Sequence, residues 1–234
     1  MRTIIHIGQH KTGTTSIQHY LQSHRDTLAQ QGLYVPNVLM GFGNPSHFML
    51  NVYALDEHRE STAKIRLKET VSNNFFEDLE ARMHKDIQQH YLNAAKENCQ
   101  EIIWSNEGLY LLNSEHEYQR LRDLFGSLAG ETLCICCFRD KESYARSYKA
   151  QLESLDLPLS EDPDSYRYFG EDSWLFDYEG KVKLLEKVFD EVLVLDYDSQ
   201  DMVKTFMTSI NYTPEDDTSR MRLNPTDKPP TKSG

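Results

Sequence analysis

The stretch TIIHIGQHKTGTTS, residues 3–16, decides the fold of this chain. Its apolar first half ends in a glycine, which predicts a short buried strand that runs into a polar loop over residues 8–13. Apolar residues at helical spacing after the loop predict a helix from about residue 14 to residue 30, which stops before Gly32. The chain therefore opens with a strand, a loop and a helix.

The same alternation of strand and helix continues along the chain. Further strands are expected at 101–105, 131–138 and 191–197, where short apolar runs occur. Helices are expected at about 76–94, 115–128, 141–155, 174–189 and 200–210, the second of them after an S-x-x-E capping box at Ser114 and Glu117. Strands that alternate with helices predict an α/β fold with a mainly parallel central sheet and helices on both faces.

The composition is that of an ordinary globular protein with an acidic balance. The chain has 234 residues, of which 38% are hydrophobic and 26% charged, and a formal net charge of −12. This length suits a single domain over 1–234, with a weakly structured tail at 211–234 that is poor in apolar residues. Because polyanion binders use broad basic surfaces, the balance argues against nucleic acid or an anionic membrane as a partner. Any anionic ligand is expected to be held locally.

The cysteines and the amino-terminal residues bear on metal binding and compartment. The start MRTIIHIGQH lacks the long apolar core of a signal peptide, and no run of 18 apolar residues occurs, so a cytoplasmic location is expected. Cys134 and Cys136 fall on one face of an expected strand and Cys137 on the other, which is typical of buried thiols. No HExxH pattern occurs among the nine histidines, so no metal site is expected.

The loop over 8–13 has the glycine spacing of a phosphate-binding P-loop, between a strand and a helix. Such a loop turns its backbone N–H groups inward, and the helix N-terminus adds partial positive charge, so an anion is bound without a basic surface. A nucleoside-triphosphatase would place lysine directly after the second glycine. Here Thr14 and Thr15 follow Gly13, and Lys11 stands at the apex of the loop.

The string Lys11-Thr12-Gly13-Thr14-Thr15 resembles the 5′-phosphosulfate loop of the sulfotransferases that use 3′-phosphoadenosine 5′-phosphosulfate (PAPS). The resemblance implies a P-loop-type nucleotide-binding fold in which Lys11 contacts the oxygen that bridges phosphate and sulfate. It also implies that the two threonines and the loop amides hold the 5′-phosphate, with no metal. The residues expected at the donor are therefore Gln9, His10, Lys11, Thr12, Gly13, Thr14, Thr15 and Ser16.

A second resemblance lies after the strand at 131–138. Arg139 and Ser147 are similar in spacing to the element with which this family grips the 3′-phosphate of PAPS. Eight positions are two steps of four, so Ser147 shares a helix face with Ser143 and points back toward Arg139. Arginine suits this role because its planar fork donates two hydrogen bonds to one phosphate. The family's Arg-x-Pro is absent here, since Lys141 stands in place of the proline.

Two residues are candidates for the base that takes the acceptor proton. Glu107 follows the strand at 101–105 in the string SNEGLY, which resembles the Ser-x-Glu segment of carbohydrate sulfotransferases. The alternative is His47 in NPSHFML, because imidazole titrates near neutrality and serves as base in the small-molecule branch of the family. In parallel sheets, ligands bind beyond the carboxyl ends of the strands, so the loops 8–13, 105–108 and 139–141 are expected to face one crevice.

The function expected from these motifs is PAPS-dependent sulfuryl transfer to a hydroxyl, or less favourably an amine, of a carbohydrate or other small acceptor. Two alternatives stay open. A nucleotide kinase or nucleoside-triphosphatase is favoured by the loop glycines and by Asp196, which follows four apolar residues as a Mg²⁺-organising aspartate would. A non-catalytic nucleotide-binding protein would keep the fold without an acceptor site. The segments 38–72 and 153–173 are expected to build the acceptor cleft, and their sequence does not identify the acceptor.

Overall fold

The computed structural model describes residues 1–43, 45–197, 201–214 and 218, so most of the tail expected at 211–234 lies outside the described residues. The described chain contains a five-stranded sheet in which every neighbouring pair of strands is parallel. Its order is β2-β3-β1-β4-β5, with β1 in the centre. The strands are β1 Arg2–His6, β2 Leu33–Tyr34, β3 Glu101–Ser105, β4 Glu131–Phe138 and β5 Glu191–Asp196. The predicted parallel α/β fold is confirmed.

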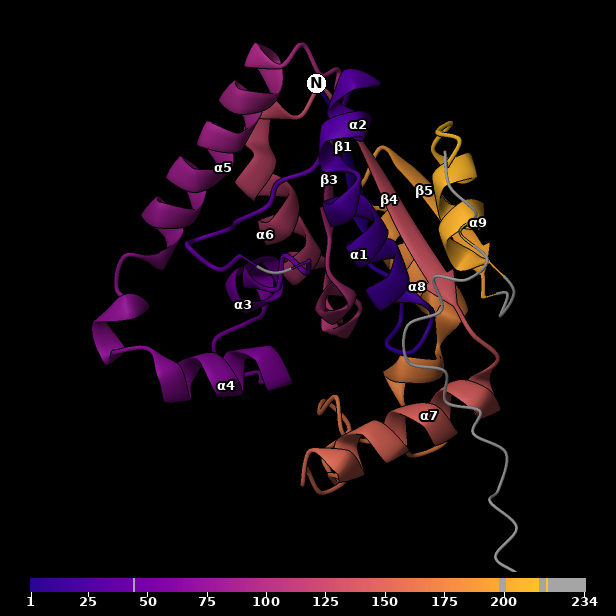
Figure 1. Cartoon of the computed structure of the whole chain (residues 1–234). Helices are drawn as coiled ribbons and strands as arrows, with labels where there is room; N and C mark the ends of the chain where they lie inside the picture. The colour runs from indigo at the N-terminus through magenta and orange to yellow at the C-terminus, as the bar shows by residue number, and fades with distance from the viewer. Residues whose placement is uncertain (44, 198–200, 215–217, 219–234) are drawn as a thin grey trace, which may run out of the picture.

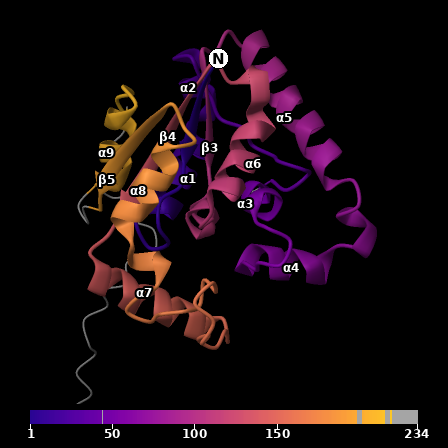
Figure 2. The ribbon, with the colours of Figure 1, turned by 180° about the vertical axis from the view of Figure 1, so that it is seen from behind.

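Helices cover both faces of the sheet, and they do so because β1 and β4 are apolar on both sides. One face packs against α1 (Thr14–Ser23), α2 (Arg25–Gln30) and α9 (Met202–Ser209). The other packs against α3 (Met49–Ala54), α5 (Leu79–Lys96), α6 (Glu115–Phe125) and α8 (Tyr178–Glu186). Figure 1 shows α1 in front of the sheet, and Figure 2, seen from behind, brings α8 to the front.

Strand alternation divides the core into two clusters, as the sequence predicts. Ile4 lies in the cluster under α1 and α9, whereas Ile5 lies in the larger cluster under α5 and α6. The cysteines of β4 divide in the same way, with Cys134 and Cys136 in the larger cluster and Cys137 in the other. All three thiols are free and buried, as expected for small core side chains.

Two helices lie beyond the carboxyl ends of the strands. They are α4 (Thr62–Thr70) and α7 (Lys141–Ser154), at the end of the molecule toward which β4 points in Figure 1. Short 3₁₀ segments connect the larger elements, namely η1 Asn73–Phe75, η2 Glu107–Leu111, η3 Gly126–Leu128 and η4 Trp174–Phe176. Of these, η2 directly follows β3 and therefore starts at the same end of the sheet as α7.

Three predicted helices have different bounds in the structure. The helix expected over 14–30 is broken at His24, because the hydroxyl of Ser23 bonds the carbonyl oxygens of His19 and Tyr20 and interrupts the helical ladder. The helix expected to reach residue 128 ends at Phe125, where Gly126 takes a positive φ of 48°. The helix expected from 174 begins as η4, and α8 starts only after Asp177, whose side chain accepts from the amide of Gly180.

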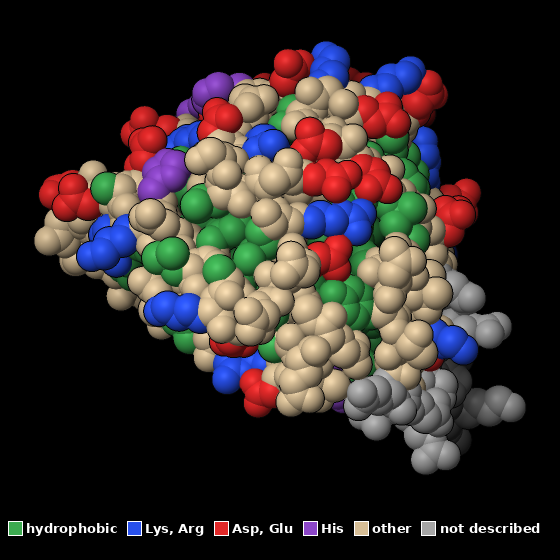
Figure 3. All heavy atoms as spheres, turned by 90° about the horizontal axis from the view of Figure 1, so that it is seen from above, with side chains coloured by type: hydrophobic (Ala, Val, Ile, Leu, Met, Phe, Trp, Pro, Cys, Tyr) green, Lys and Arg blue, Asp and Glu red, His purple; other side chains and the backbone are tan. Residues whose placement is uncertain are grey.

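The outer surface mixes charges of both signs. Figure 3, which looks onto the top of the molecule in Figure 1, shows acidic and basic side chains side by side rather than a broad basic face. At the amino ends of the strands, Arg2 lies 3.1 Å from Glu101 and 3.0 Å from Glu191. In the part of the chain that the structure describes, no helix is long and apolar enough to span a membrane.

Candidate functional site

The loop between β1 and α1, residues 8–13, forms an amide-lined cradle that we call the glycine loop. Lys11 (φ 67°) and Gly13 (φ 76°) both take the left-handed conformation, and this sequence of backbone turns directs successive N–H groups toward one point. Helix α1 starts with no acidic residue in its first turn and no side-chain cap. The amides of Gly13, Thr14 and Thr15 donate to no residue that the structure describes. The cradle therefore offers free donors and a helix N-terminus to an anion.

At both glycines of the loop, neighbouring atoms lie too close to leave room for a side chain. A β-carbon at Gly8 would lie 2.9 Å from Nε2 of His6 and 3.0 Å from the methyl group of Thr14. A β-carbon at Gly13 would lie 3.0 Å from that of Met202 on α9, in addition to the strain of a positive φ. The loop is thus packed tightly against His6, Thr14 and Met202.

Two of the residues predicted at the donor have side chains that point into the protein. Gln9 is fully buried, its amide nitrogen donating to the hydroxyl of Tyr110 (3.0 Å) and its oxygen accepting from the amide of Arg139 (2.9 Å). The buried hydroxyl of Thr12 donates to the carbonyl oxygen of Gln9 (2.6 Å). These residues shape the glycine loop from inside and tie it to η2 and to the end of β4.

The hydroxyl-bearing residues after the loop lie at the start of α1. Thr14 and Ser16 are buried, and Thr15 is half-buried. One turn further along the same helix, Gln18 is also buried and faces η2. The first turn of α1 therefore connects the cradle to the segment that carries Glu107.

Arg139 meets the glycine loop in space, as predicted for loops at the same end of the sheet. Its Nη1 donates to the carbonyl oxygen of Lys11 (3.2 Å), and its guanidinium carbon lies 5.1 Å from the centre of the Tyr197 ring. The carbonyl oxygen of Arg139 accepts from the hydroxyl of Tyr178 (2.8 Å). The guanidinium is thereby fixed beside the loop.

Ser147 lies on α7 and is half-buried. Its hydroxyl oxygen is enclosed and has no hydrogen-bond partner among the described residues. The next residue, Tyr148, places its ring 5.1 Å from that of His10. Helix α7 therefore reaches the glycine loop through Tyr148.

His10 stands where the glycine loop adjoins a cavity. Its Nδ1 is enclosed and makes no hydrogen bond to a residue in the described ranges. Burial lowers the pKa of His10; the charge of Lys11 also lowers this pKa, and the charge of Glu107 opposes the shift. The charges of Lys11 and Glu107 are thus both close enough to His10 to act on its ring.

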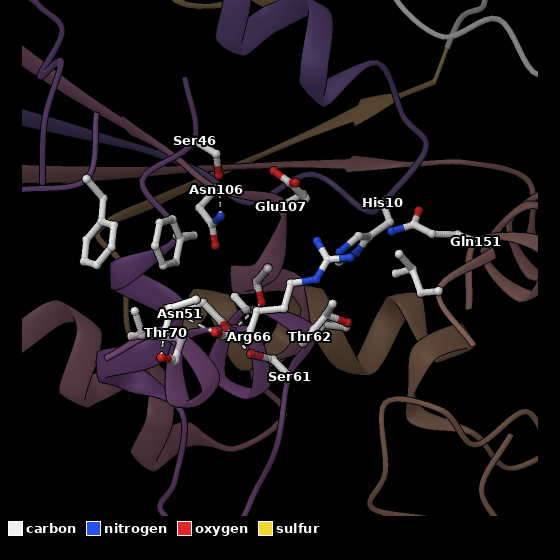
Figure 4. Close-up of a pocket in the computed structure, with 17 residues that line it drawn as sticks. His10, Ser46, Asn51, Ser61, Thr62, Arg66, Thr70, Asn106, Glu107 and Gln151 are labelled. Carbon is white, nitrogen blue, oxygen red and sulfur yellow. Dashed lines mark hydrogen bonds between the residues drawn. The ribbon is translucent and has the colours of Figure 1, made fainter. Parts of the chain in front are cut away.

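The cavity has a volume of about 490 Å³, within the ordinary range for small-molecule sites. It is bounded by α3, α4, η2 and the end of α7, together with the loop before α3 (Figure 4). Glu107, Asn106 and His10 line it on the side of the glycine loop, and Arg66 of α4 and Gln151 of α7 line it elsewhere. A chemical group in this cavity would thus be next to the anion cradle.

Glu107, the first residue of η2, is the carboxylate of the cavity. The side-chain amide of Gln18 donates to its Oε2 at 2.6 Å. Its Oε1 accepts no hydrogen bond from a described residue. One oxygen is therefore held in place, and the other is available to a ligand.

Two buried cations fix the far end of η2. The ammonium of Lys181 donates to the carbonyl oxygens of Tyr110 (3.2 Å) and Leu112, and burial lowers the pKa of Lys181 to about 7. The guanidinium of Arg59 donates to the carbonyl oxygen of Leu111 (3.0 Å) and pairs with buried Glu117 (2.5 Å). These contacts hold η2, and with it the backbone of Glu107, against the sheet.

His47 does not lie in the cavity, contrary to its prediction as an alternative base. Its Nδ1 accepts from the amide of Ser105 (3.0 Å), and its Nε2 donates to the carbonyl oxygen of Pro36 (2.8 Å). Burial lowers the pKa of His47 to about 4. The neutral ring joins the loop before α3 to the end of β3, and neither of its nitrogens is free to take a proton from an acceptor.

The sequence reasoning missed three side chains that the structure places at the site. Gln18 had no assigned role, although its position one turn after Thr14 put it on the helix face toward the crevice. Asn106 directly precedes Glu107 at a strand end, which was a usable signal. Arg66 lies in a segment without a motif, and only the tertiary structure brings it to the cavity (Figure 4).

In the described ranges, no cluster of three or more His, Cys, Asp or Glu side chains is arranged to hold a metal ion. The donor atoms at the site are instead backbone amides, a lysine, an arginine and hydroxyl groups. This set of donors suits phosphate and sulfate oxygens. The cradle and its surroundings thus fit the anionic donor that the sequence predicts.

Comparison with known proteins supports the fold. No protein-family model matches the chain, and no curated protein matches it. Among solved structures, a sulfotransferase from Alicyclobacillus acidocaldarius is similar, with a TM-score of 0.56 and 14% sequence identity over 96% of this chain and 86% of that chain. At this level of identity the likeness concerns the architecture, and the chain has the α/β fold seen in that sulfotransferase.

Proposed function

We propose that this protein is a sulfotransferase that moves the sulfuryl group of PAPS to a hydroxyl of a carbohydrate or other small acceptor. One observation carries the proposal: an amide cradle with Lys11 and Arg139 beside it opens next to a cavity that contains the carboxylate of Glu107. The architectural likeness to a solved sulfotransferase supports the same conclusion.

In this proposal, different residues around the cradle bind the two phosphate groups of the donor. The free amides of Gly13 to Thr15 and the two threonine hydroxyls would hold the 5′-phosphate, as the helix N-terminus favours negative charge. Arg139 and the unused hydroxyl of Ser147 would hold the 3′-phosphate. When bound, PAPS supplies the sulfuryl group.

Two side chains of the site carry the chemistry in this proposal. Glu107 takes the proton of the acceptor hydroxyl at its unengaged oxygen, while Gln18 holds the other oxygen and so orients the carboxylate. Lys11, at the tip of the glycine loop, offsets the negative charge that develops on the leaving oxygen. Because the cavity adjoins the loop, the acceptor and this cation are held close together, which lowers the entropic cost of reaction.

Calorimetry in the absence of Mg²⁺ tests the proposal. The product nucleotide 3′-phosphoadenosine 5′-phosphate should bind, whereas ATP and GTP should not. Mg²⁺-dependent binding of a triphosphate would instead favour the kinase reading, with Asp196 at the end of β5 as the metal-organising residue. Binding of the bisphosphate without turnover across a broad panel of acceptors, measured with labelled donor, would favour a non-catalytic protein.

A further inference from the structure

The acceptor cavity contains a cation that the proposed transfer reaction does not use. Arg66 is exposed on α4, and Figure 4 shows its side chain extending across the cavity toward Glu107 and His10. Its guanidinium forms no ion pair with a carboxylate in the described part of the chain. Arg66 therefore faces the cavity without a compensating charge. An oxyanion on the acceptor would supply that charge.

The cavity is also lined by Asn106, whose side-chain oxygen has no hydrogen-bond donor among the described residues. Asn106 is only 3% exposed, and its side-chain nitrogen donates to the hydroxyl of Ser46 (2.7 Å). Its Oδ1 is enclosed and accepts from no described residue. A β-carbon at Gly108 would lie 2.8 Å from this oxygen, so the glycine keeps the space around it open. Because an unpaired buried carbonyl is costly, Oδ1 calls for a ligand that brings a donor.

We propose, on the basis of the proposed sulfotransferase function, that the acceptor is a hydroxylated compound that carries a carboxylate or a sulfate. Arg66 binds this oxyanion, and a second hydroxyl of the acceptor donates to Oδ1 of Asn106. Both groups line the same cavity as Glu107, so one molecule engages all three residues. Arg66 and Asn106 are thus specificity-determining residues for the acceptor.

The rest of the cavity suits a sugar ring. The rings of Phe42 and Phe48 line it, with their centres 5.1 Å apart in an edge-to-face arrangement. They offer an apolar wall to the C–H face of a pyranose, while Glu107, Asn106 and Arg66 offer polar groups elsewhere in the cavity. An acidic or sulfated sugar combines the apolar face, the hydroxyl donors and the oxyanion that these walls require.

Binding of three matched probes tests this inference. They are 4-nitrophenyl β-glucoside, the corresponding β-glucuronide and the glucoside 6-sulfate, each titrated by calorimetry into the complex with 3′-phosphoadenosine 5′-phosphate. At least one anionic probe should bind about 10-fold more tightly than the neutral glucoside, as expected for a charge-assisted hydrogen bond. A preference for the glucuronide identifies a carboxylate as the oxyanion, and a preference for the 6-sulfate identifies a sulfate.

Variants at Arg66 and Asn106 show which of the two residues accounts for the affinity of each probe. Arg66→Gln should bring the anionic probes to the affinity of the neutral glucoside without changing the affinity for the nucleotide. Lys68→Gln removes a charge from the same helix outside the cavity and should change neither. Asn106→Leu should weaken all three probes by about 10-fold; its thermal unfolding, compared with that of the parent, identifies any loss due to misfolding.

The inference is overturned by any of three results: no probe binds, the neutral glucoside binds as tightly as both anionic probes, or Arg66→Gln weakens the nucleotide as much as the anionic probes. The last result would assign Arg66 to the donor. The proposed function is judged separately, by formation of labelled sulfated product. Anion-dependent binding without product would leave the acceptor inference standing and remove the assignment as a sulfotransferase.

Discussion

The guanidinium of Arg139 lies 3.2 Å from the carbonyl oxygen of Lys11, although 128 positions separate the two residues. The contact joins the end of β4 to the tip of the glycine loop, next to β1. Gln9 makes a second connection between the same two segments through the amide of Arg139. The guanidinium of Arg139 is thereby held against the backbone at the tip of the glycine loop.

Arg139→Ala should lower the affinity for 3′-phosphoadenosine 5′-phosphate by about 100-fold, because a bidentate charge-assisted contact is lost. Affinity for adenosine 5′-phosphate, which lacks the 3′-phosphate, should change little. Calorimetry with both nucleotides measures the two effects. Arg146→Ala, an exposed arginine on α7, serves as the control and should bind both as the parent does. Equal weakening of both nucleotides would contradict our assignment of Arg139.

Lys11→Ala should lower kcat by about 100- to 1,000-fold, while nucleotide affinity falls by less than about 10-fold. The reason is that the ammonium acts on charge that develops only during transfer. Steady-state rates with labelled donor and calorimetry separate the two quantities. Lys85→Ala, at an exposed site on α5, controls for loss of a charge. A variant that keeps the kcat of the parent at saturating donor but binds the nucleotide much more weakly would show that Lys11 is a binding residue only.

Glu107→Gln should lower kcat by about 100- to 10,000-fold and leave nucleotide binding unchanged, since it removes the proton acceptor but keeps the shape of the side chain. His47→Gln provides the contrast. It should retain most of the turnover per folded molecule and lose about 1–3 kcal/mol of stability, because the buried amide of Ser105 loses its acceptor. Loss of turnover in the histidine variant with an active Glu107→Gln protein would reverse the assignment.

Gln9→Leu should destabilise the protein by about 1–3 kcal/mol, because the amide of Arg139 loses its acceptor. It should also weaken nucleotide binding, since the glycine loop loses its tie to β4. Gln9→Glu keeps an acceptor oxygen for that amide and should lose less affinity. Denaturant unfolding and calorimetry on the two variants provide the comparison, and equal affinities for the nucleotide would show that the loop holds its shape without Gln9.

Stability should fall with acid between pH 6.5 and pH 5. Burial lowers the pKa of His6 to about 3 and that of His47 to about 4, against about 6.5 in the unfolded chain. The unfolded state therefore binds more protons in this window, and each histidine contributes a slope of up to about 1.4 kcal/mol per pH unit. Above pH 6.5 this contribution is fully present. Urea unfolding at several pH values measures the slope, which should be shallower in His47→Gln; a flat profile would contradict the burial of both rings as neutral groups.

The sequence predicts the centre of the fold well because β1, β3 and β4 are apolar on both faces and end in polar loops. The glycine loop was equally visible, since its residues are consecutive and their roles follow from backbone geometry. Three elements could not be predicted from the sequence. Strand β2 is two residues long, and α3 and α4 lie in the segment 38–72, which has little periodicity of its own. Their positions are set by packing against distant elements.

The same holds for the side chains of the site: a role could be predicted where it follows from neighbours in the sequence, but not where it depends on residues far away in the chain. Glu107 could be found because it directly follows a strand. The role of His47 could not be read from the sequence, because its two partners are the backbone of Pro36 and of Ser105, and the second is 58 positions away. Gln9 was placed at the donor on the basis of its neighbours in the loop. Its real partners, Tyr110 and Arg139, become visible only when three strands are assembled.

The left-handed backbone at Lys11 has a consequence for the whole molecule. A residue with a side chain holds this conformation at a disadvantage of about 1–2 kcal/mol relative to glycine. Glycine at this position would therefore give a sturdier protein, and it would lack the ammonium at the tip of the loop. At the apex of the loop, stability would favour glycine, whereas the proposed transfer reaction requires the ammonium of a lysine.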